Sequence, residues 1–143
     1  MGFRLIVDQL YPNGFSDWAS LNTWMRKLYD KLAKVEEWHE VGATNEPAFE
    51  NSWANISTDR LAAFYKDPQG RVHLKGLIHA GSVGFTAFTL PAGYRPADQK
   101  IFAVISNGAL GRVDVSNLGF VQIITPSTNN YVSLDGISFR AEQ

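Results

Sequence analysis

The sequence predicts a mainly β fold: an antiparallel β-sandwich or jelly roll preceded by a short N-terminal coiled-coil helix. Between residues 16 and 35 apolar residues recur every three or four positions, which is helical spacing. From residue 53 onward they alternate with polar residues in short runs that are separated by turn residues, as in antiparallel sheets. No helical pattern lies between these runs, which excludes a parallel α/β fold. The length of 143 residues suffices for one such domain and a short appendage.

The first segment of the chain, residues 1–15, is unusually apolar for a terminus. We interpret it as an anchoring segment that docks on a partner protein, for example by adding a strand to an exposed sheet edge. The alternative, that it folds back onto the helix, remains open. The predicted anchoring residues are Phe3, Leu5, Ile6, Val7, Leu10 and Tyr11.

A helix of coiled-coil type is predicted over residues 16–38. Pro12, Asn13 and Gly14 indicate a turn, after which Ser16 or Asp17 can cap the first helical amides. Apolar residues then follow the a/d spacing of a heptad repeat. This a/d stripe consists of Trp18, Leu21, Met25, Leu28, Leu32 and Val35. Because so few heptads are present, an amphipathic helix that packs on its own domain remains an equal alternative.

Residues 39–55 are predicted to connect the helix to the sandwich, because their composition is mixed and includes Pro47. The sandwich is expected over residues 56–143, with about eight short strands. The clearest hairpin has the turn Asp67-Pro68-Gln69-Gly70, with proline at the first central position and glycine at the end. The predicted strands are residues 61–66, 71–79, 85–90, 100–106, 112–115, 120–125, 131–134 and 137–140.

The composition narrows the classes of function. With 13 Lys and Arg against 14 Asp and Glu, the formal charge of −1 leaves no basic stripe for nucleic acid. The absence of cysteine excludes disulfides, thiolate metal sites and cysteine nucleophiles, and fits assembly in a reducing cytoplasm. No apolar run approaches the roughly 20 residues that cross a bilayer, so we expect neither an export signal nor membrane insertion.

Little in the sequence indicates catalysis. A polysaccharide-degrading enzyme would need paired carboxylates about 5 to 9.5 Å apart. The candidates are expected to cap turns instead, where Asp side chains accept backbone N–H groups. These candidates are Asp59, Asp67, Asp98, Asp114 and Asp135. We predict a non-enzymatic protein with no catalytic residues and no cofactor.

Histidines and aromatic residues are the remaining candidate binding groups. His73 and His79 are expected on the same side of one strand, roughly 20 Å apart and with Lys75 between them, so we predict no metal site. Trp53 is expected to be buried. Tyr94 and Tyr131 lie near loops, where a flat ring can stack on a sugar or a partner protein, and are the candidate receptor contacts.

Several segments resemble proteins of bacteriophage particles. The segment Phe64–Leu77, with its Lys-Asp turn followed by Gly, Val-x-Leu and Gly-Leu, resembles a segment common in phage tail and minor structural proteins. The resemblance extends through residues 88–96, 102–106 and 132–139, and so covers most of the chain from Trp53 to Arg140. Its most specific part is Leu-Pro-Ala-Gly-Tyr-Arg-Pro, residues 90–96.

The resemblance implies a C-terminal knob of a phage fibre, a class of modules that typically form homotrimers after a coiled-coil stalk. It therefore implies that the a/d stripe mediates trimerisation, and that the protein is part of the virion, assembled in the host cytoplasm. The implied function is host-receptor adhesion, with a cell-surface glycan as the expected receptor. Two alternatives remain: a capsid head fibre or decoration protein that stabilises the shell, and a polysaccharide-degrading enzyme.

Overall fold

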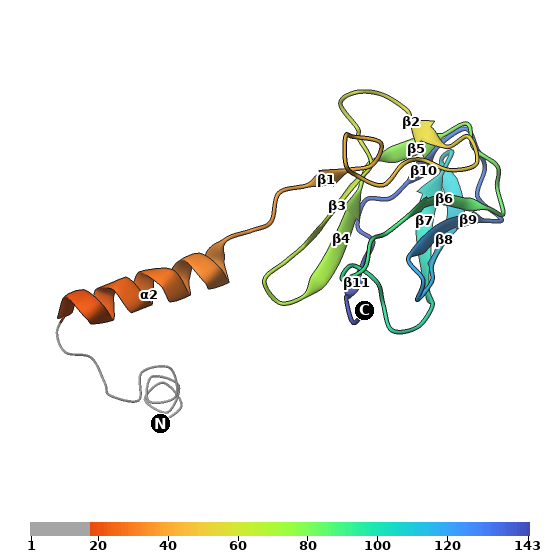
Figure 1. The fold of residues 1–143 in the computed structure, drawn as a ribbon. Helices are drawn as coiled ribbons and strands as arrows, with labels where there is room; N and C mark the ends of the chain where they lie inside the picture. Colours follow the sequence, from red (N-terminus) through yellow and green to blue (C-terminus); the bar gives the residue numbers. More distant parts are fainter. Residues whose placement is uncertain (1–17) are drawn as a thin grey trace. The chain divides into compact units, whose positions relative to one another are not determined.

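The structure, a computed structural model, describes residues 18–143 and divides the chain into two compact units. The first, Met1–Lys34, contains the helix α2 (Trp18–Ala33); the second, Val35–Gln143, contains eleven strands and is called the β-domain below (Figure 1). The predicted anchoring residues, from Phe3 to Tyr11, lie outside the described residues. Within the described part, no helix has the length and apolar character needed to span a membrane.

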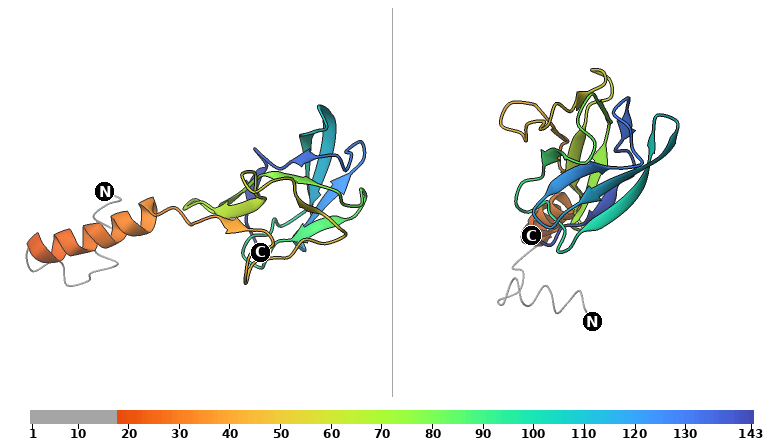
Figure 2. Two further views of the ribbon diagram at one scale, coloured as in Figure 1. Left: turned by 90° about the horizontal axis from the view of Figure 1, so that it is seen from above. Right: turned by 90° about the vertical axis from the view of Figure 1, so that its right-hand side faces the viewer.

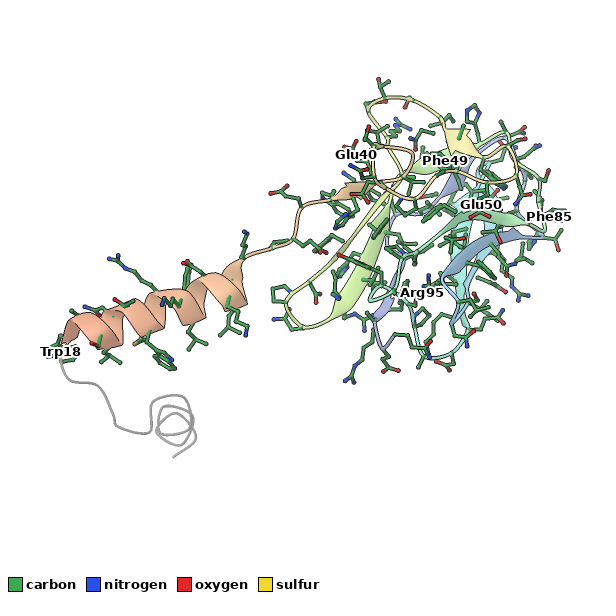
Figure 3. All side chains as sticks on the ribbon, in the orientation of Figure 1. Trp18, Glu40, Phe49, Glu50, Phe85 and Arg95 are labelled. Carbon is green, nitrogen blue, oxygen red and sulfur yellow. The ribbon has the colours of Figure 1, made fainter. Side chains whose placement is uncertain are left out.

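Helix α2 confirms the predicted N-terminal helix but ends at Ala33, so Val35 of the predicted a/d stripe lies beyond it. Most of the stripe is exposed: Trp18, labelled at the start of α2 in Figure 3, is 77% exposed, and Leu32 is 59% exposed. The buried residue of α2 is Trp24, which the a/d spacing does not include. It lies beside the stripe, because successive residues of a helix are about 100° apart. The apolar surface of the helix is therefore wider than the heptad pattern predicts.

The smaller of two antiparallel sheets contains the predicted hairpin. Its strand order is β1-β3-β4-β11. In the turn between β3 and β4, the Oδ1 atom of Asp67 accepts hydrogen bonds from the amides of Gln69 (3.0 Å) and Arg71 (2.9 Å). Gly70 has a φ of +85°, a conformation that favours glycine. The strands are β1 (His39–Glu40), β3 (Ala63–Lys66), β4 (Arg71–Lys75) and β11 (Ser138–Arg140).

The larger, seven-stranded sheet curls into a half-barrel, with the order β2-β5-β10-β7-β8-β9-β6. Its longest pairing is the hairpin β7-β8, which runs from the pair Lys100 and Val115 to the pair Ser106 and Ala109. A register shift between Thr86 and Phe88 marks an irregularity in β6. The strands are β2 (Ala54–Asn55), β5 (Leu77–His79), β6 (Thr86–Thr89), β7 (Lys100–Ser106), β8 (Ala109–Val115), β9 (Phe120–Ile124) and β10 (Val132–Ser133).

The two sheets form the layers of a sandwich whose apolar faces share one core (Figure 2). Alternation places Val72 and Leu74 of β4 in this core together with Val113 and Val115 of β8. Full burial of such a side chain contributes about 1.5 to 3 kcal/mol. The predicted mainly β fold is confirmed. Trp53 is buried in this core, as predicted.

Two expectations about the elements are corrected. Residues 71–79 do not form one strand: the chain leaves β4 of the small sheet and enters β5 of the large sheet at Gly76. Gly76 has a φ of +107°, and a Cβ there would lie 2.4 Å from the carbonyl oxygen of Leu61, so only glycine fits. His73 and His79 consequently lie in different sheets.

The segment 39–55 is more than a connection. It contributes β1 and β2, one to each sheet, and buries Val41 in the core. Each of these strands has only two residues. The segment is part of the β-domain because burial of Val41 removes apolar surface from water.

Candidate functional site

A polar groove of about 270 Å³ lies where the chain passes from the small sheet to the large one. Three stretches that are distant in sequence form it: the loop before β3, the junction between β4 and β5, and the turn after β10. Its lining residues are Asp59, Arg60, Leu61, Lys75, Gly76, Leu77 and Asp135, and we refer to it as the groove.

Hydrogen bonds fix the backbone of the groove. The amide of Gly76 donates to Oδ1 of Asp135 at 2.8 Å, and the carbonyl oxygen of Gly76 accepts from the amide of Leu134 at 2.8 Å. The amide of Leu77 donates to the carbonyl oxygen of Arg60 at 3.1 Å. The groove is thus held in one shape without a ligand, which is favourable for binding.

The charged side chains of the groove form no close ion pair with one another. Within residues 18–143, no ion pair joins Arg60 or Lys75 to Asp59 or Asp135. A hydrogen bond from the Ser57 hydroxyl lowers the pKa of Asp59 below its ordinary value, and the nearby charge of Arg60 lowers it further, so this carboxyl stays ionised near neutral pH. Two carboxylates and two cations therefore face the same small space with hydrogen-bonding capacity to spare.

A row of aromatic rings on the small sheet leads to the groove. The Trp38 ring meets Tyr65 edge-on, with 4.6 Å between centroids, and Tyr65 stacks on His73 at 4.9 Å. Nζ of Lys75, which lines the groove, lies 4.5 Å from the centroid of Trp38. Because Trp38 is 39% exposed, it presents a partly open aromatic surface beside the groove.

His73, at the end of this row away from Trp38, is hydrogen-bonded to the turn of the β3-β4 hairpin. Nε2 of His73 lies 2.8 Å from Oδ2 of Asp67, and this hydrogen bond lowers the pKa of Asp67. The same carboxylate caps the turn amides, as the sequence predicts for Asp67. The row is thus positioned by the hairpin.

Tyr94, a predicted receptor contact, belongs to a second polar cluster. Its hydroxyl donates to Oε1 of Glu36, and its ring packs edge-on against the buried Phe64 at 5.1 Å. Burial, together with the hydrogen bond to Glu36, raises the pKa of Tyr94. Through these contacts Tyr94 stabilises the fold. A receptor contact at Tyr94 stays a prediction.

Glu36 and His39 complete this cluster. Oε2 of Glu36 accepts from the amide of Lys66 at 2.7 Å, and Nδ1 of His39 lies 2.8 Å from Oε1 of Glu46. Burial alone would lower the pKa of His39, but the hydrogen bonds to Glu46 and Glu36 raise it. Burial alone would raise the pKa of Glu36, but its hydrogen bonds from Tyr94 and Lys66 lower it. The cluster holds residues 36–39 against the rest of the β-domain.

Tyr131, the other predicted contact, is half-buried at the start of β10. Its carbonyl oxygen accepts hydrogen bonds from the Ser106 hydroxyl (3.0 Å) and the Asn107 amide (3.2 Å). These bonds involve its backbone, so the role of its ring as a receptor contact also stays a prediction. Neither tyrosine lines the groove.

Two expectations about the carboxylates can be assessed. Asp114 does not cap a turn, because it lies inside β8 and is 3% exposed. It forms a bidentate ion pair with Arg112, whose Nε and Nη2 each donate a hydrogen bond of 2.7 Å. Asp59 and Asp135 line one groove, but the lowered pKa of Asp59 does not suit a general acid.

Among residues 18–143, no cluster of three or more His, Cys, Asp or Glu has a metal-binding arrangement.

One face of the large sheet exposes three large apolar side chains. Ile105 of β7 pairs with Leu110 of β8, and Ile101 lies on the same face farther along β7, beyond the pair Ala103 and Arg112. They are 55%, 64% and 61% exposed. Exposed apolar side chains beside charged residues are common at interaction surfaces. We call these three residues the β7-β8 patch.

Comparison with known proteins gives one structural likeness. Neither a protein-family profile nor a curated protein matches the sequence. The chain is similar to the receptor binding protein (gp15) of Listeria phage PSA, with a TM-score of 0.62 over 95% of this chain and 86% of that one. The chain shares the fold of a phage receptor-binding protein. At 14% identity, this likeness shows the fold and not the binding residues.

The groove and the aromatic row were missed by the sequence analysis. Their residues come from four separate stretches of the chain, near residues 38, 60, 76 and 135, which only the folded sheets bring together. One signal was available, because Gly76 interrupts an otherwise regular strand pattern and marks a bend or a close backbone approach.

Proposed function

We propose that the protein is a bacteriophage virion component, a trimeric fibre subunit that presents its β-domain to a receptor on the host cell. The observation that carries this proposal is the likeness in fold to the phage receptor binding protein gp15, over 95% of the chain. The resemblance of residues 64–77 and 90–96 to phage tail proteins supports it independently of the structure.

A homotrimer is supported by two exposed apolar surfaces. The a/d stripe of α2 leaves Trp18, Met25 and Leu32 largely in solvent, and the β-domain exposes the β7-β8 patch. Association would remove both from water, and each buried side chain contributes about 1.5 to 3 kcal/mol. Three parallel copies of α2 are too short to hold a trimer alone, so contacts between β-domains are part of the proposal.

The anchoring role of residues 1–15 is also proposed. Six apolar side chains in this segment fit a peptide that docks on another virion protein. In this arrangement the N-terminal segment would attach the fibre, α2 would join three chains, and the β-domain would contact the host.

Adhesion rather than catalysis fits the chemistry of the β-domain. The groove brings the ionised Asp59 together with Arg60 and Lys75, which form no close ion pair with it, and such a polar lining suits reversible binding of a polar ligand. A cell-surface glycan is such a ligand, and it is the receptor class that we propose.

The test is binding of the purified full chain to host cells, compared with resistant cells whose surface glycans differ. We expect saturable binding to the sensitive cells alone. Equal binding to both, or none, would contradict the receptor role. Immunogold labelling of virions distinguishes a tail fibre from a capsid head fibre or decoration protein, and release of reducing ends from host polysaccharide would indicate an enzyme instead.

A further inference from the structure

We propose that the groove, together with the adjoining Trp38 ring, binds a neutral saccharide and is the receptor-recognition site of the β-domain. This inference rests on the proposed adhesion function and adds to it a location, a ligand class and the residues that make contact. It differs from the sequence-based candidates, because neither Tyr94 nor Tyr131 lines the groove.

The charge of the groove selects the ligand class. The carboxylates of Asp59 and Asp135 balance the cations of Arg60 and Lys75, so the lining has no net formal charge. A phosphate or another polyanion would be attracted by the cations but repelled by the carboxylates at the same short range. A sugar hydroxyl can both donate and accept, and so uses both kinds of group.

The hydrogen-bonding groups are available to such a ligand. In the part of the chain that the structure describes, no hydrogen bond or ion pair engages the guanidinium of Arg60. Asp59 uses Oδ1 for the Ser57 hydroxyl, which leaves Oδ2 as an acceptor. Asp135 accepts from the Gly76 amide at Oδ1 and, at 3.4 Å, from the Ser133 hydroxyl at Oδ2, and each carboxylate oxygen can accept a second hydrogen bond. Hydrogen bonds between such charged groups and hydroxyls are stronger than those between neutral groups.

Trp38 adds the apolar contact that sugar recognition needs. One side of a pyranose ring carries mostly C–H groups, which pack well on a flat aromatic ring. Trp38 is 39% exposed, so part of its ring is open to a ligand. Tyr65 meets the ring edge-on, and Nζ of Lys75, 4.5 Å from its centroid, covers part of one face. Lys75 also lines the groove. An aromatic surface therefore adjoins a rim of convergent polar groups, the usual composition of a small-ligand site.

The site is also formed in advance. The hydrogen bonds of Gly76 to Asp135 and Leu134 fix its backbone, so binding need not order a loop. Because less conformational entropy is lost on binding, more of the favourable free energy of the contacts contributes to affinity. In a trimer, three such sites would act together on a surface glycan, which compensates for weak binding at each one.

The experiment uses the full chain and titrates it with D-glucose, D-galactose, N-acetylglucosamine, L-rhamnose and, as the anionic probe, glycerol phosphate. Binding is followed by saturation-transfer NMR and by the indole N–H signal of Trp38, which is assigned with the Trp38→Phe variant. We expect millimolar, saturable binding of at least one of the four neutral sugars, with a shift of the Trp38 signal.

Two pairs of variants locate the site. Asp59→Asn and Arg60→Ala change exposed side chains that are not part of the core, so both should fold. Each should weaken sugar binding about tenfold, the loss typical of one hydrogen bond to a charged group. The matched controls Asp98→Asn and Arg140→Ala change exposed residues of the same types outside the groove, and should bind like the original chain.

Several results would overturn the inference: no binding of any neutral sugar, binding that the Asp59 and Arg60 variants leave unchanged, or preferential binding of glycerol phosphate. Measurements of host-cell binding distinguish a wrong assignment of the groove from a wrong proposal of adhesion. If the original chain binds sensitive cells and both groove variants bind equally well, the adhesion function stands and the groove is not its site. If the original chain binds no cells, the adhesion function itself fails.

Discussion

The hydroxyl of Tyr94 donates a hydrogen bond to the carboxylate of Glu36, which lies 58 residues earlier in the chain. The other oxygen of Glu36 accepts from the amide of Lys66, so this carboxylate links β3 to the loop that carries Tyr94. Glu36 follows α2 closely in sequence and belongs to the β-domain. The β-domain thus has a defined beginning, fixed by a partly buried polar cluster.

Removal of the Tyr94 hydroxyl should destabilise the β-domain. Tyr94→Phe keeps the ring contact with Phe64 but leaves the Glu36 carboxylate without one of its donors. The expected loss in the free energy of unfolding is about 1 to 3 kcal/mol, measured by denaturant titration. Tyr131→Phe is the matched control, because the hydrogen bonds that Tyr131 accepts from Ser106 and Asn107 use its carbonyl oxygen, and it should change stability little. Equal losses in the two variants would contradict the role of the Glu36 bond.

The stability of the β-domain should depend on pH on both sides of neutrality. The pKa of His39 is raised in the fold, so its contribution is complete below its unfolded pKa of 6.5 and is lost as the pH rises through the folded value. The pKa of Glu36 is lowered, so its contribution is present above its unfolded pKa of 4.5 and is lost as the pH falls through the folded value.

The His39→Gln variant tests the alkaline side of this profile. Thermal unfolding between pH 5 and about pH 8 should show a smaller decline in stability for the variant than for the original chain. His79→Gln serves as the control, because His79 lies in β5 and is not part of the cluster. A decline of the same size in all three proteins would rule out His39 as its source.

Gly76 should tolerate no side chain. Gly76→Ala places a Cβ 2.4 Å from the carbonyl oxygen of Leu61 in a backbone with φ of +107°. We expect a loss of more than about 2 kcal/mol in unfolding free energy. Gly70→Ala is the matched control: its φ is also positive, at +85°, but no atom lies within 4 Å of the added Cβ. The Gly70 variant should lose only about 1 kcal/mol. Similar losses would show that the close approach to Leu61 is unimportant.

Association through α2 should depend on the a/d stripe. Replacement of both Leu28 and Leu32 by Ser should lower the oligomeric state while the β-domain keeps its circular dichroism and thermal transition, since α2 lies outside the β-domain. A double change of Lys27 and Lys31 to Ser, on the polar face, is the control. A monomeric original chain in light scattering at micromolar concentration would defeat the trimer proposal.

Deletion of residues 2–11 tests the proposed anchor. The truncated chain should remain a folded, soluble trimer but should fail to join particles assembled without the native copy, because the docking peptide is gone. Normal incorporation would contradict anchoring. Loss of folding would support the alternative, in which the segment packs back onto the helix.

The sequence predicted those elements whose signals are local. The β3-β4 hairpin follows from Asp67, Pro68 and Gly70 within one turn, and β7 has the predicted bounds, Lys100–Ser106. The predicted helix cap at Ser16 or Asp17 and the predicted anchoring residues lie outside the described residues, and they stay predictions.

The features that sequence could not predict depend on tertiary contacts. The passage from one sheet to the other at Gly76 requires the neighbouring Leu61 backbone, and β1 and β2 are too short to show a periodic pattern. The burial of Asp114 depends on its bond with Arg112, two residues away in the same strand, which the alternation of β8 places on one face. The groove could not be predicted for the same reason, since it joins residues from turns that are distant in sequence at the break between β4 and β5.

The central claim, adhesion to a host receptor through the β-domain, is tested most directly by competition with the virus. Sensitive cells are incubated with increasing amounts of the purified original chain, and the adsorption of phage particles is then counted. Our account predicts that adsorption falls in proportion to receptor occupancy, and that the Asp98→Asn chain competes equally well. Undiminished adsorption at saturating protein would contradict it.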